Sequence, residues 1–166
     1  MSKAKEIAFA ALMAAVMFVV QVALSFLPNI ELVSILVIVS AVAFGRRTLM
    51  SIYIFALLEG LCYGFGIWWV NYCYVWTILY VVARFLKKWE SPVMWAVISG
   101  IYGLSFGFLC AIPYGLAGGI YAGLSYWVSG IPFDLIHCIG NFAVALVLFR
   151  PLCNICKKIN TSFYRY

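Results

Sequence analysis

Long apolar runs, broken only by short turns and small clusters of charge, make up most of this chain. A helix that crosses a lipid bilayer needs about 20 mostly apolar residues. The runs are continuous and do not alternate between polar and apolar positions, as the strands of a membrane β-barrel would. The pattern predicts an all-α membrane protein with six transmembrane helices, at about 5–27, 30–44, 48–64, 70–86, 92–112 and 132–150.

The overall composition supports this prediction. Hydrophobic residues make up 67% of the 166 residues and charged residues 10%, whereas a soluble domain is about half apolar and about a quarter charged. Six helices with short turns use the whole length, so residues 1–166 are expected to form a single transmembrane domain.

The basic residues predict how the chain is oriented. All 11 Lys and Arg lie near the N-terminus, or at or beyond the end of the second, fourth or sixth predicted helix. Because cytoplasmic loops are enriched in Lys and Arg, both termini and the even-numbered turns are expected in the cytoplasm. The basic residues that give the net charge of +6 therefore flank membrane helices, and no nucleic-acid partner is expected.

The segment from Pro113 to Gly130 is apolar enough for a seventh span. A seventh span would place the last cluster of basic residues outside the cell, so we expect an external re-entrant loop or short surface helix there.

Polar side chains inside apolar runs are costly in lipid and mark candidate sites. Asp134, His137 and Asn141 are spaced i, i+3 and i+7, which places them on one face of a helix. The candidates lie in the outer half, where acidic, amide and aromatic groups occur without Lys or Arg. Such a site suits a planar neutral or cationic heterocycle better than a phosphate. The candidate binding residues are Glu59, Trp68, Asn71, Tyr74, Trp127, Asp134, His137 and Asn141, with Asn29 and Glu31 at the first outer turn.

Structural roles remain open for many of these residues. Trp and Tyr near a membrane surface commonly form an interfacial belt, and Asp134 or Asn141 could tie helices together. His137 could pair with Asp134 or relay protons. Glu59 needs either a partner or a wet pocket. Cys153 and Cys156 form a lone CxxC pair, which is too few ligands for a structural zinc site, and no metal or cofactor is predicted.

The first predicted helix carries small residues at Ala10, Ala11, Ala14 and Ala15. The pairs Ala10/Ala14 and Ala11/Ala15 have the small-xxx-small spacing that lets a second helix approach closely. That second helix could belong to this chain or to a partner.

Motifs for known enzyme classes are missing from the sequence. It has no HExxH, no GxSxG and no P-loop, so the chain is not expected to be an enzyme or to use ATP by itself. Two alternatives stay open: a small membrane enzyme that uses Glu59, His137 and Asp134, and a stand-alone carrier with Glu59 as its proton site.

Three stretches of the chain resemble the substrate-binding (S) components of energy-coupling factor transporters. They are the alanine-rich segment Ala10 to Ala15, the turn Pro28-Asn29-Ile30-Glu31 leading to Phe44-Gly45-Arg46-Arg47, and the run from Tyr126-Trp127 through Gly130 to His137 and Gly140-Asn141 to Pro151-Leu152. The resemblance extends over essentially the whole chain, and size and orientation also agree.

The resemblance implies a function. Such proteins have six helices and bind a vitamin or related micronutrient in their outer half, in the bacterial plasma membrane. The turn with Asn29 and Glu31 would gate the pocket. Ala10, Ala11, Ala14 and Ala15 would dock on a membrane coupling subunit that carries two cytoplasmic ATPases, and the S component is thought to topple during transport. The resemblance implies no single vitamin, so the pocket residues are assigned from their position and polarity.

Overall fold

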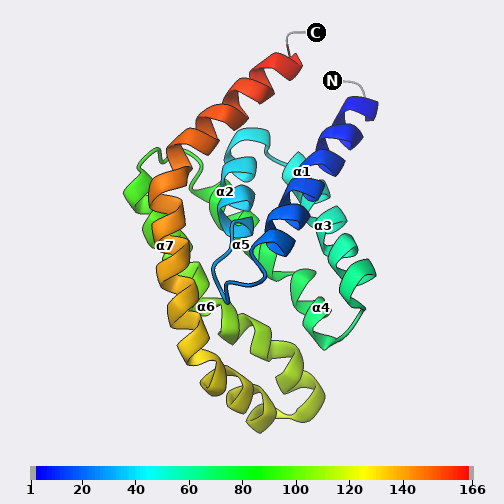
Figure 1. The fold of residues 1–166 in the computed structure, drawn as a ribbon, viewed down its shortest axis with the longest axis vertical. Coiled ribbons are helices and arrows are strands. Elements are labelled where there is room, and N and C mark those ends of the chain that lie inside the picture. Colours follow the sequence, from blue (N-terminus) through cyan, green and yellow to red (C-terminus); the bar gives the residue numbers. More distant parts are fainter. Residues whose placement is uncertain (1–2, 165–166) are drawn as a thin grey trace.

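Helices are the only regular secondary structure in a computed structural model that describes residues 3–164, with side chains through residue 161. No strand occurs among these residues, which confirms the predicted all-α class. The helices, shown in Figure 1, are α1 (Lys3–Ala23), α2 (Val33–Phe44), α3 (Arg47–Tyr63), α4 (Ile67–Tyr72), α5 (Val75–Phe85), α6 (Pro92–Gly118) and α7 (Ile120–Tyr164).

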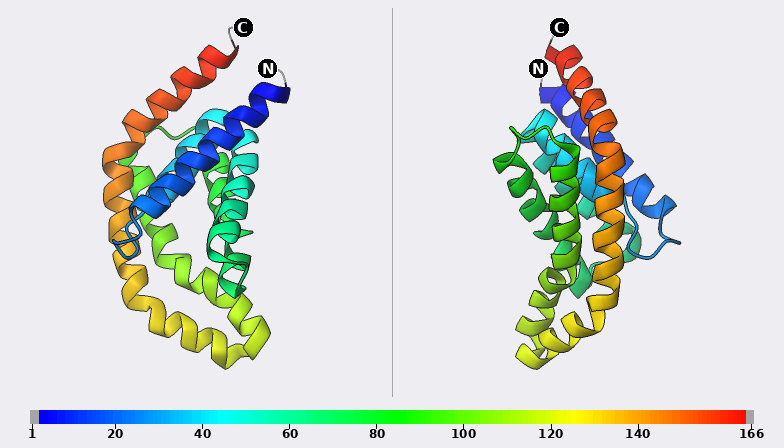
Figure 2. Two further views of the ribbon diagram at one scale, coloured as in Figure 1. Left: turned by 45° about the vertical axis from the view of Figure 1, so that its right-hand side comes forward. Right: turned by 90° about the vertical axis from the view of Figure 1, so that its left-hand side faces the viewer.

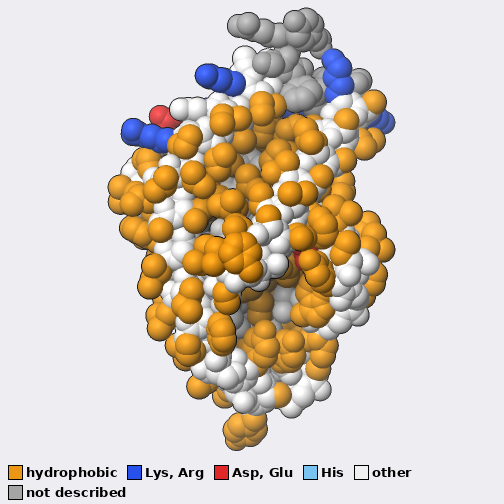
Figure 3. Space-filling view, in the orientation of Figure 1, with side chains coloured by type: hydrophobic (Ala, Val, Ile, Leu, Met, Phe, Trp, Pro, Cys, Tyr) orange, Lys and Arg blue, Asp and Glu red, His pale blue; other side chains and the backbone are white. Residues whose placement is uncertain are grey.

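Apolar side chains cover much of the outside, whereas several polar side chains are buried. Phe85 is 87% exposed and Leu116 is 84% exposed, and Figure 3 shows hydrophobic side chains over most of the visible face. Three helices are long and apolar enough to cross a membrane: α1, α6 and the Ile120–Thr161 part of α7. Such a surface fits a lipid environment. The buried polar side chains include Glu31, Glu59, Asn71, Asp134, His137 and Asn141.

The basic clusters, far apart in sequence, meet at one end of the molecule, which we call the basic end. Arg47 Nε lies 3.1 Å from Glu6 Oε1, which joins the start of α3 to α1. Lys157 Nζ lies 3.2 Å from Glu90 Oε1, which joins the last part of α7 to the α5–α6 turn. On the face drawn in Figure 3, Lys and Arg side chains are confined to the end where both termini lie.

Two predicted spans are short or broken. The 12 residues of α2 reach about 18 Å at about 1.5 Å per residue, less than the hydrocarbon core of about 30 Å. The span expected at 70–86 is divided into α4 and α5, with Cys73 and Tyr74 between them. Figure 1 shows that the segment joining α1 to α2 ends midway along the molecule, whereas the α6–α7 hairpin extends farther.

The prediction of a loop or short surface helix at Pro113 to Gly130 is wrong. α6 continues through Pro113 to Gly118, and α7 begins at Ile120, so the segment is the tip of a helical hairpin. Gly119 makes the turn with φ +83°, a conformation that favours glycine. Figure 2 shows α7 bending in the part that follows this turn.

Tyr74 explains how α6 tolerates a proline in its interior. Pro113 has no N–H to donate to the carbonyl of Leu109, four residues earlier. The Tyr74 hydroxyl donates to that carbonyl at 2.6 Å. The Tyr74 side chain, from the break between α4 and α5, therefore gives the Leu109 carbonyl a hydrogen-bond partner that lipid could not supply. The helix continues past the proline.

Glycines on one face of α6 let α7 approach closely. A Cβ added at Gly103 would lie 2.8 Å from the backbone oxygen of His137. At Gly107 an added Cβ would overlap the Asp134 carboxylate, and the Gly107 N–H donates to Asp134 Oδ1 at 2.9 Å. The polar face of α7 thus lies directly against α6 backbone.

Gly103→Ala is therefore expected to lower the free energy of unfolding by about 1–3 kcal/mol, the usual range for overpacking. The matched control is Gly115→Ala in the same helix, where an added Cβ would make an ordinary 3.7 Å contact with Gly123. Its stability should be unchanged or raised by up to about 1 kcal/mol, since alanine favours helix. Denaturant unfolding in detergent micelles measures both variants, and equal stability of the two would contradict this account of the packing.

Candidate functional site

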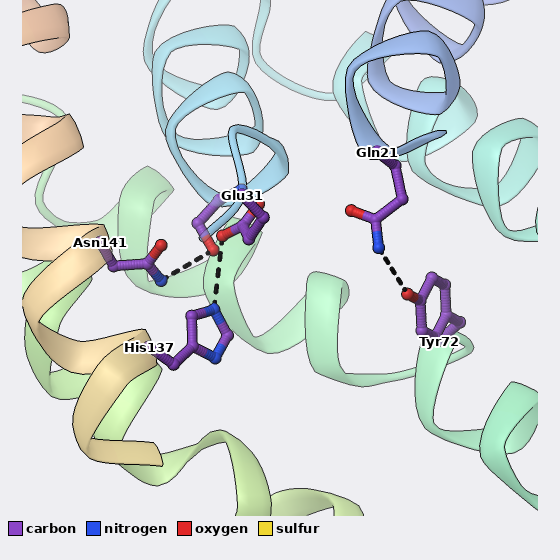
Figure 4. A network of polar contacts seen from close by, with 6 residues as sticks. Gln21, Glu31, Tyr72, His137 and Asn141 are labelled. Carbon is purple, nitrogen blue, oxygen red and sulfur yellow. Dashed lines mark hydrogen bonds and ion pairs between the residues drawn. The ribbon is translucent and has the colours of Figure 1, made fainter. Parts of the chain in front are cut away.

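The central cavity, of about 300 Å³, lies beneath the segment that joins α1 to α2. Its polar lining comes from Gln21 of α1, Glu31 of that segment, Tyr72 of α4 and His137 of α7, together with Ser25 and Asn29. Figure 4 shows Glu31 facing His137 and Gln21 facing Tyr72. Residues from four separate parts of the chain therefore converge on one cavity. Its remaining lining residues are Leu24, Leu27, Pro28, Ile30, Trp76 and Phe106.

Glu31 connects the joining segment to both α2 and α7. Its Oε2 accepts a hydrogen bond of 2.8 Å from the backbone N–H of Ser34, in the first turn of α2. This interaction satisfies a helix N–H that has no partner within the helix. Its Oε1 lies 3.5 Å from Nε2 of His137, a long hydrogen bond that becomes an ion pair when the imidazole is protonated. Asn141 strengthens the junction because its Nδ2 donates to Ser34 Oγ at 3.2 Å.

The backbone conformation at Asn29 and the close packing at Gly140 also hold the joining segment in position. Asn29 has φ 58°, the only non-glycine residue with positive φ in the part of the chain that the structure describes. Asparagine adopts this region more readily than most residues. A Cβ at Gly140 would lie 3.4 Å from the Asn29 carbonyl oxygen, so glycine at that position lets the segment rest against α7.

Two further cavities adjoin the central one through shared residues. The Glu59 cavity, of about 280 Å³, is lined by Glu59, Tyr63 and Trp68 and shares Gln21 and Ser25 with the central cavity. The Asp134 cavity, of about 360 Å³, shares Asn29 and Phe106 with it. The other residues that line the Asp134 cavity are Gly107, Cys110, Tyr126, Ser129, Gly130, Phe133 and Asp134.

Several buried polar atoms in and beside these cavities have no hydrogen-bond partner among the described residues. Glu59 is 3% exposed, and leaving a carboxylate without a partner in a low-dielectric interior is costly. Ligand groups that donate hydrogen bonds or carry positive charge would complement its oxygen. The atoms without partners are Gln21 Oε1, Glu59 Oε1, Asp134 Oδ2, His137 Nδ1 and Asn141 Oδ1.

Aromatic rings form the apolar walls. The Tyr72 and Trp76 rings meet edge to face with centroids 5.7 Å apart, and Trp68 meets Tyr72 at 5.5 Å. Phe106 continues this wall, since its ring lies 5.9 Å from Trp76 and 5.0 Å from the His137 ring. Aromatic rings beside carboxylates favour a flat ligand that stacks and carries hydrogen-bond donors or positive charge.

The structure brings most, but not all, of the predicted site residues together. Glu59 and Trp68 line one cavity, Asp134 lines another, and Asn29, Glu31 and His137 line the central one. Asp134, His137 and Asn141 all have buried side chains, as expected of one inward face. The histidine, however, lies next to Glu31 rather than hydrogen-bonded to Asp134, because the joining segment folds back onto α7.

Four predicted residues line none of these cavities: Asn71, Tyr74, Trp127 and Asn141, whose side chain bonds Ser34. The Tyr74 hydroxyl lies 3.0 Å from Asn71 Oδ1 and also bonds the carbonyl of Leu109, so both side chains hold the α4–α5 break against α6. Trp127 packs on Phe108, with ring centroids 5.2 Å apart, in an apolar groove between α6 and α7. The assignments of Asn71, Tyr74, Trp127 and Asn141 as substrate-binding residues therefore receive no support from the cavity linings.

Sequence reasoning missed Gln21 and Ser34. Gln21 donates through Nε2 to the Tyr72 hydroxyl at 3.3 Å and lines two of the three cavities. A glutamine inside the first apolar run was a usable signal, since an intramembrane amide needs a partner. Ser34 gives no comparable signal, because serine is common in membrane helices.

The four alanines of α1 divide between two faces. Ala10 and Ala14 are both 0% exposed, buried within this chain where α1 packs against α3. The expectation that they dock on a partner is thus corrected for these two, because this chain already occupies their face. Ala11 and Ala15 are exposed, together with Ala4 and Ala8.

Among the described residues, no group of three or more His, Cys, Asp or Glu side chains is arranged to hold a metal ion. Cys153 and Cys156 are buried free cysteines near the basic end.

Comparisons with known proteins give this chain no relative: no family model, no curated protein and no solved structure matches it.

Proposed function

We propose that this chain is the membrane-embedded substrate-binding subunit of an ATP-driven importer of the energy-coupling factor type. Its ligand is a vitamin or related heterocyclic micronutrient. The observation that carries the proposal is the central cavity, where the segment bearing Asn29 and Glu31 closes over polar and aromatic side chains. A small-molecule site with a few convergent polar groups and aromatic walls has this character.

The charges of the three cavities support a proposal for the class of ligand. Glu31, Glu59 and Asp134 contribute carboxylates, and among the described residues no Lys or Arg lines any of the three cavities. A phosphate or polyanion would meet repulsion there, whereas a neutral or cationic ring would be attracted. The proposed ligand is therefore a flat heterocycle without negative charge.

The six crossings and their orientation belong to the same proposal. The basic end would face the cytoplasm by the positive-inside rule, and the cavities would then lie in the outer half of the bacterial plasma membrane. The fourth crossing would be α4 and α5 together. The short α2 would cross with the help of the joining segment, which lines the central cavity, one of the settings in which irregular backbone is tolerated at membrane depth.

A coupling subunit and two cytoplasmic ATPases complete the proposed assembly. The exposed alanines on α1 have the spacing i, i+4, i+7 and i+11, which forms one narrow face that another helix can approach closely. Of the predicted docking residues, Ala11 and Ala15 lie on this face, which we call the alanine face; its other members are Ala4 and Ala8.

The deciding experiment is native mass spectrometry of the purified chain, followed by titration with a panel of vitamins and nucleobases. One small heterocycle should be retained with micromolar or tighter affinity, and the isolated chain should hydrolyse no ATP. The proposal fails if no panel compound binds and the chain does not associate with a coupling subunit.

The enzyme alternative receives less support, because Glu59, His137 and Asp134 line three different cavities. His137→Gln separates the two functions. In a binding subunit the substitution should change ligand affinity only, whereas an enzyme should keep affinity and lose turnover. Transport by the chain alone in liposomes, driven by a pH gradient without ATP, would instead support a proton-coupled carrier.

A further inference from the structure

A fourth cavity, of about 380 Å³, lies at the basic end and takes no part in the proposed transport site. We call it the basic cavity. It lies between the α5–α6 turn, which contributes Lys87, Trp89 and Glu90, and α7, which contributes Arg150 and Lys157. Its other lining residues are Val42, Phe149, Cys153 and Asn154.

The walls of the basic cavity are fixed by packing. The Trp95 indole N–H donates to the carbonyl of Trp89 at 2.9 Å, which anchors the α5–α6 turn to α6. The Trp95 ring stacks on Phe149 of α7, with centroids 5.4 Å apart. The ion pair between Lys157 and Glu90 closes one side. The concave shape is thus held by contacts between elements rather than by one flexible side chain.

The charges that line the basic cavity are not balanced within the protein. Three cationic side chains line it with one carboxylate, and Glu90 is paired with Lys157 at 3.2 Å. Among the described residues, Lys87 and Arg150 have neither a salt bridge nor a side-chain hydrogen bond. Two unpaired cations beside the same concave surface attract an anion.

The surroundings favour a lipid as the source of that anion. Trp89 is 48% exposed, and tryptophan at such a position is typical of the membrane interface. Past the cavity, α6 continues with exposed Val93 and Val97, and α7 presents exposed Leu146 and Val147. A phosphate among Lys87, Arg150 and Lys157 would leave the attached acyl chains beside these apolar side chains.

We propose that the basic cavity binds the phosphate of an anionic phospholipid headgroup. Arginine contributes planar, two-point recognition of phosphate oxygens, and lysine contributes a point charge. Basic pockets between membrane helices on the cytoplasmic side are known to take such headgroups. The proposal does not depend on the identity of the imported substrate.

The test is native mass spectrometry of the full chain released from nanodiscs that contain equal amounts of phosphatidylglycerol and phosphatidylcholine. The chain should retain phosphatidylglycerol over phosphatidylcholine by about tenfold. The double variant Lys87→Gln/Arg150→Gln should reduce this preference to about twofold or less. The matched control, Lys3→Gln/Lys88→Gln, removes the same charge at the same end from residues that do not line the cavity, and it should keep the preference.

A gain-of-binding variant guards against loss by misfolding. The Glu90 side chain is 82% exposed, so Glu90→Gln should fold normally while it releases Lys157 to the lipid phosphate. Its preference for phosphatidylglycerol should rise about threefold, a smaller step than an added cation at a membrane surface would give.

Three outcomes would overturn the proposal: equal retention of the two lipids by the unaltered chain, an equal loss of preference in the control double variant, or no rise with Glu90→Gln. Inorganic phosphate distinguishes a soluble ligand from a lipid. If millimolar phosphate binds in lipid-free detergent and displaces phosphatidylglycerol completely, the cavity serves a free anion and the lipid assignment is wrong.

Discussion

Replacing Ala11 and Ala15 together by tryptophan is expected to reduce ATP-driven uptake by about 100-fold while ligand affinity stays within about twofold. Both residues lie on the exposed face of α1, where two indole rings would prevent the close helix approach that small residues permit. A 100-fold loss corresponds to about 2.7 kcal/mol of lost association energy. Neither residue lines any of the three cavities, which is why ligand binding should persist.

The measurement is uptake of radiolabelled ligand in proteoliposomes that contain the chain, the coupling subunit and the ATPases, alongside titration of the isolated chain. Leu12→Trp is the matched control, since Leu12 is already large and is 63% exposed on the same helix. Its uptake should stay close to that of the unaltered chain. Unimpaired uptake by the Ala11/Ala15 variant would remove the alanine face from the proposed partner interface.

Ala10 and Ala14 show where the sequence alone could not assign this interface. Small-xxx-small spacing predicts that a helix comes close, but not whether the helix belongs to the same chain. Ala10 and Ala14 contact the interior of this chain and Ala11 and Ala15 do not, although all four lie within six residues. The two pairs lie on different sides of α1, and the sequence alone does not show which side faces the rest of the chain.

Periodicity and turn residues predicted some helix ends closely, but not the continuation of α6 past Pro113. The third predicted span, 48–64, is close to α3 at Arg47–Tyr63, and Pro92 begins α6 as expected. Ser91 caps that helix, since its side chain accepts from the Met94 N–H. The hairpin at Pro113 to Gly130 could not be predicted, because α6 continues past its proline only where Tyr74, distant in sequence, bonds the freed carbonyl.

The inward face of α7 was predictable, whereas the partners of its residues were not. A spacing of i, i+3 and i+7 placed Asp134, His137 and Asn141 on one side, and all three are buried. Their environments differ because of glycines on α6. A Cβ at Gly107 would collide with Asp134, so Asp134 lies against α6 while His137 remains next to the segment that carries Glu31.

Glu31→Ala is expected to weaken ligand binding by about 100-fold, or about 2.7 kcal/mol, and to lower the free energy of unfolding by about 2 kcal/mol. The stability loss follows because the buried N–H of Ser34 loses its acceptor. The affinity loss follows because His137 loses its charged neighbour, and because the segment over the central cavity loses its attachment to both α2 and α7.

Glu31→Gln separates these two effects. Its amide oxygen can still accept from Ser34, so stability should return to within about 1 kcal/mol of the unaltered chain. Affinity for a cationic heterocycle should stay reduced, because the charge beside His137 is gone. Glu90→Gln, at an exposed carboxylate of the basic end, is the control and should bind the ligand normally. Titration calorimetry and denaturant unfolding measure the two quantities. If Glu31→Gln binds a cationic ligand as tightly as the unaltered chain does, Glu31 acts only as a helix cap, and the attraction for positive charge must come from Glu59 or Asp134.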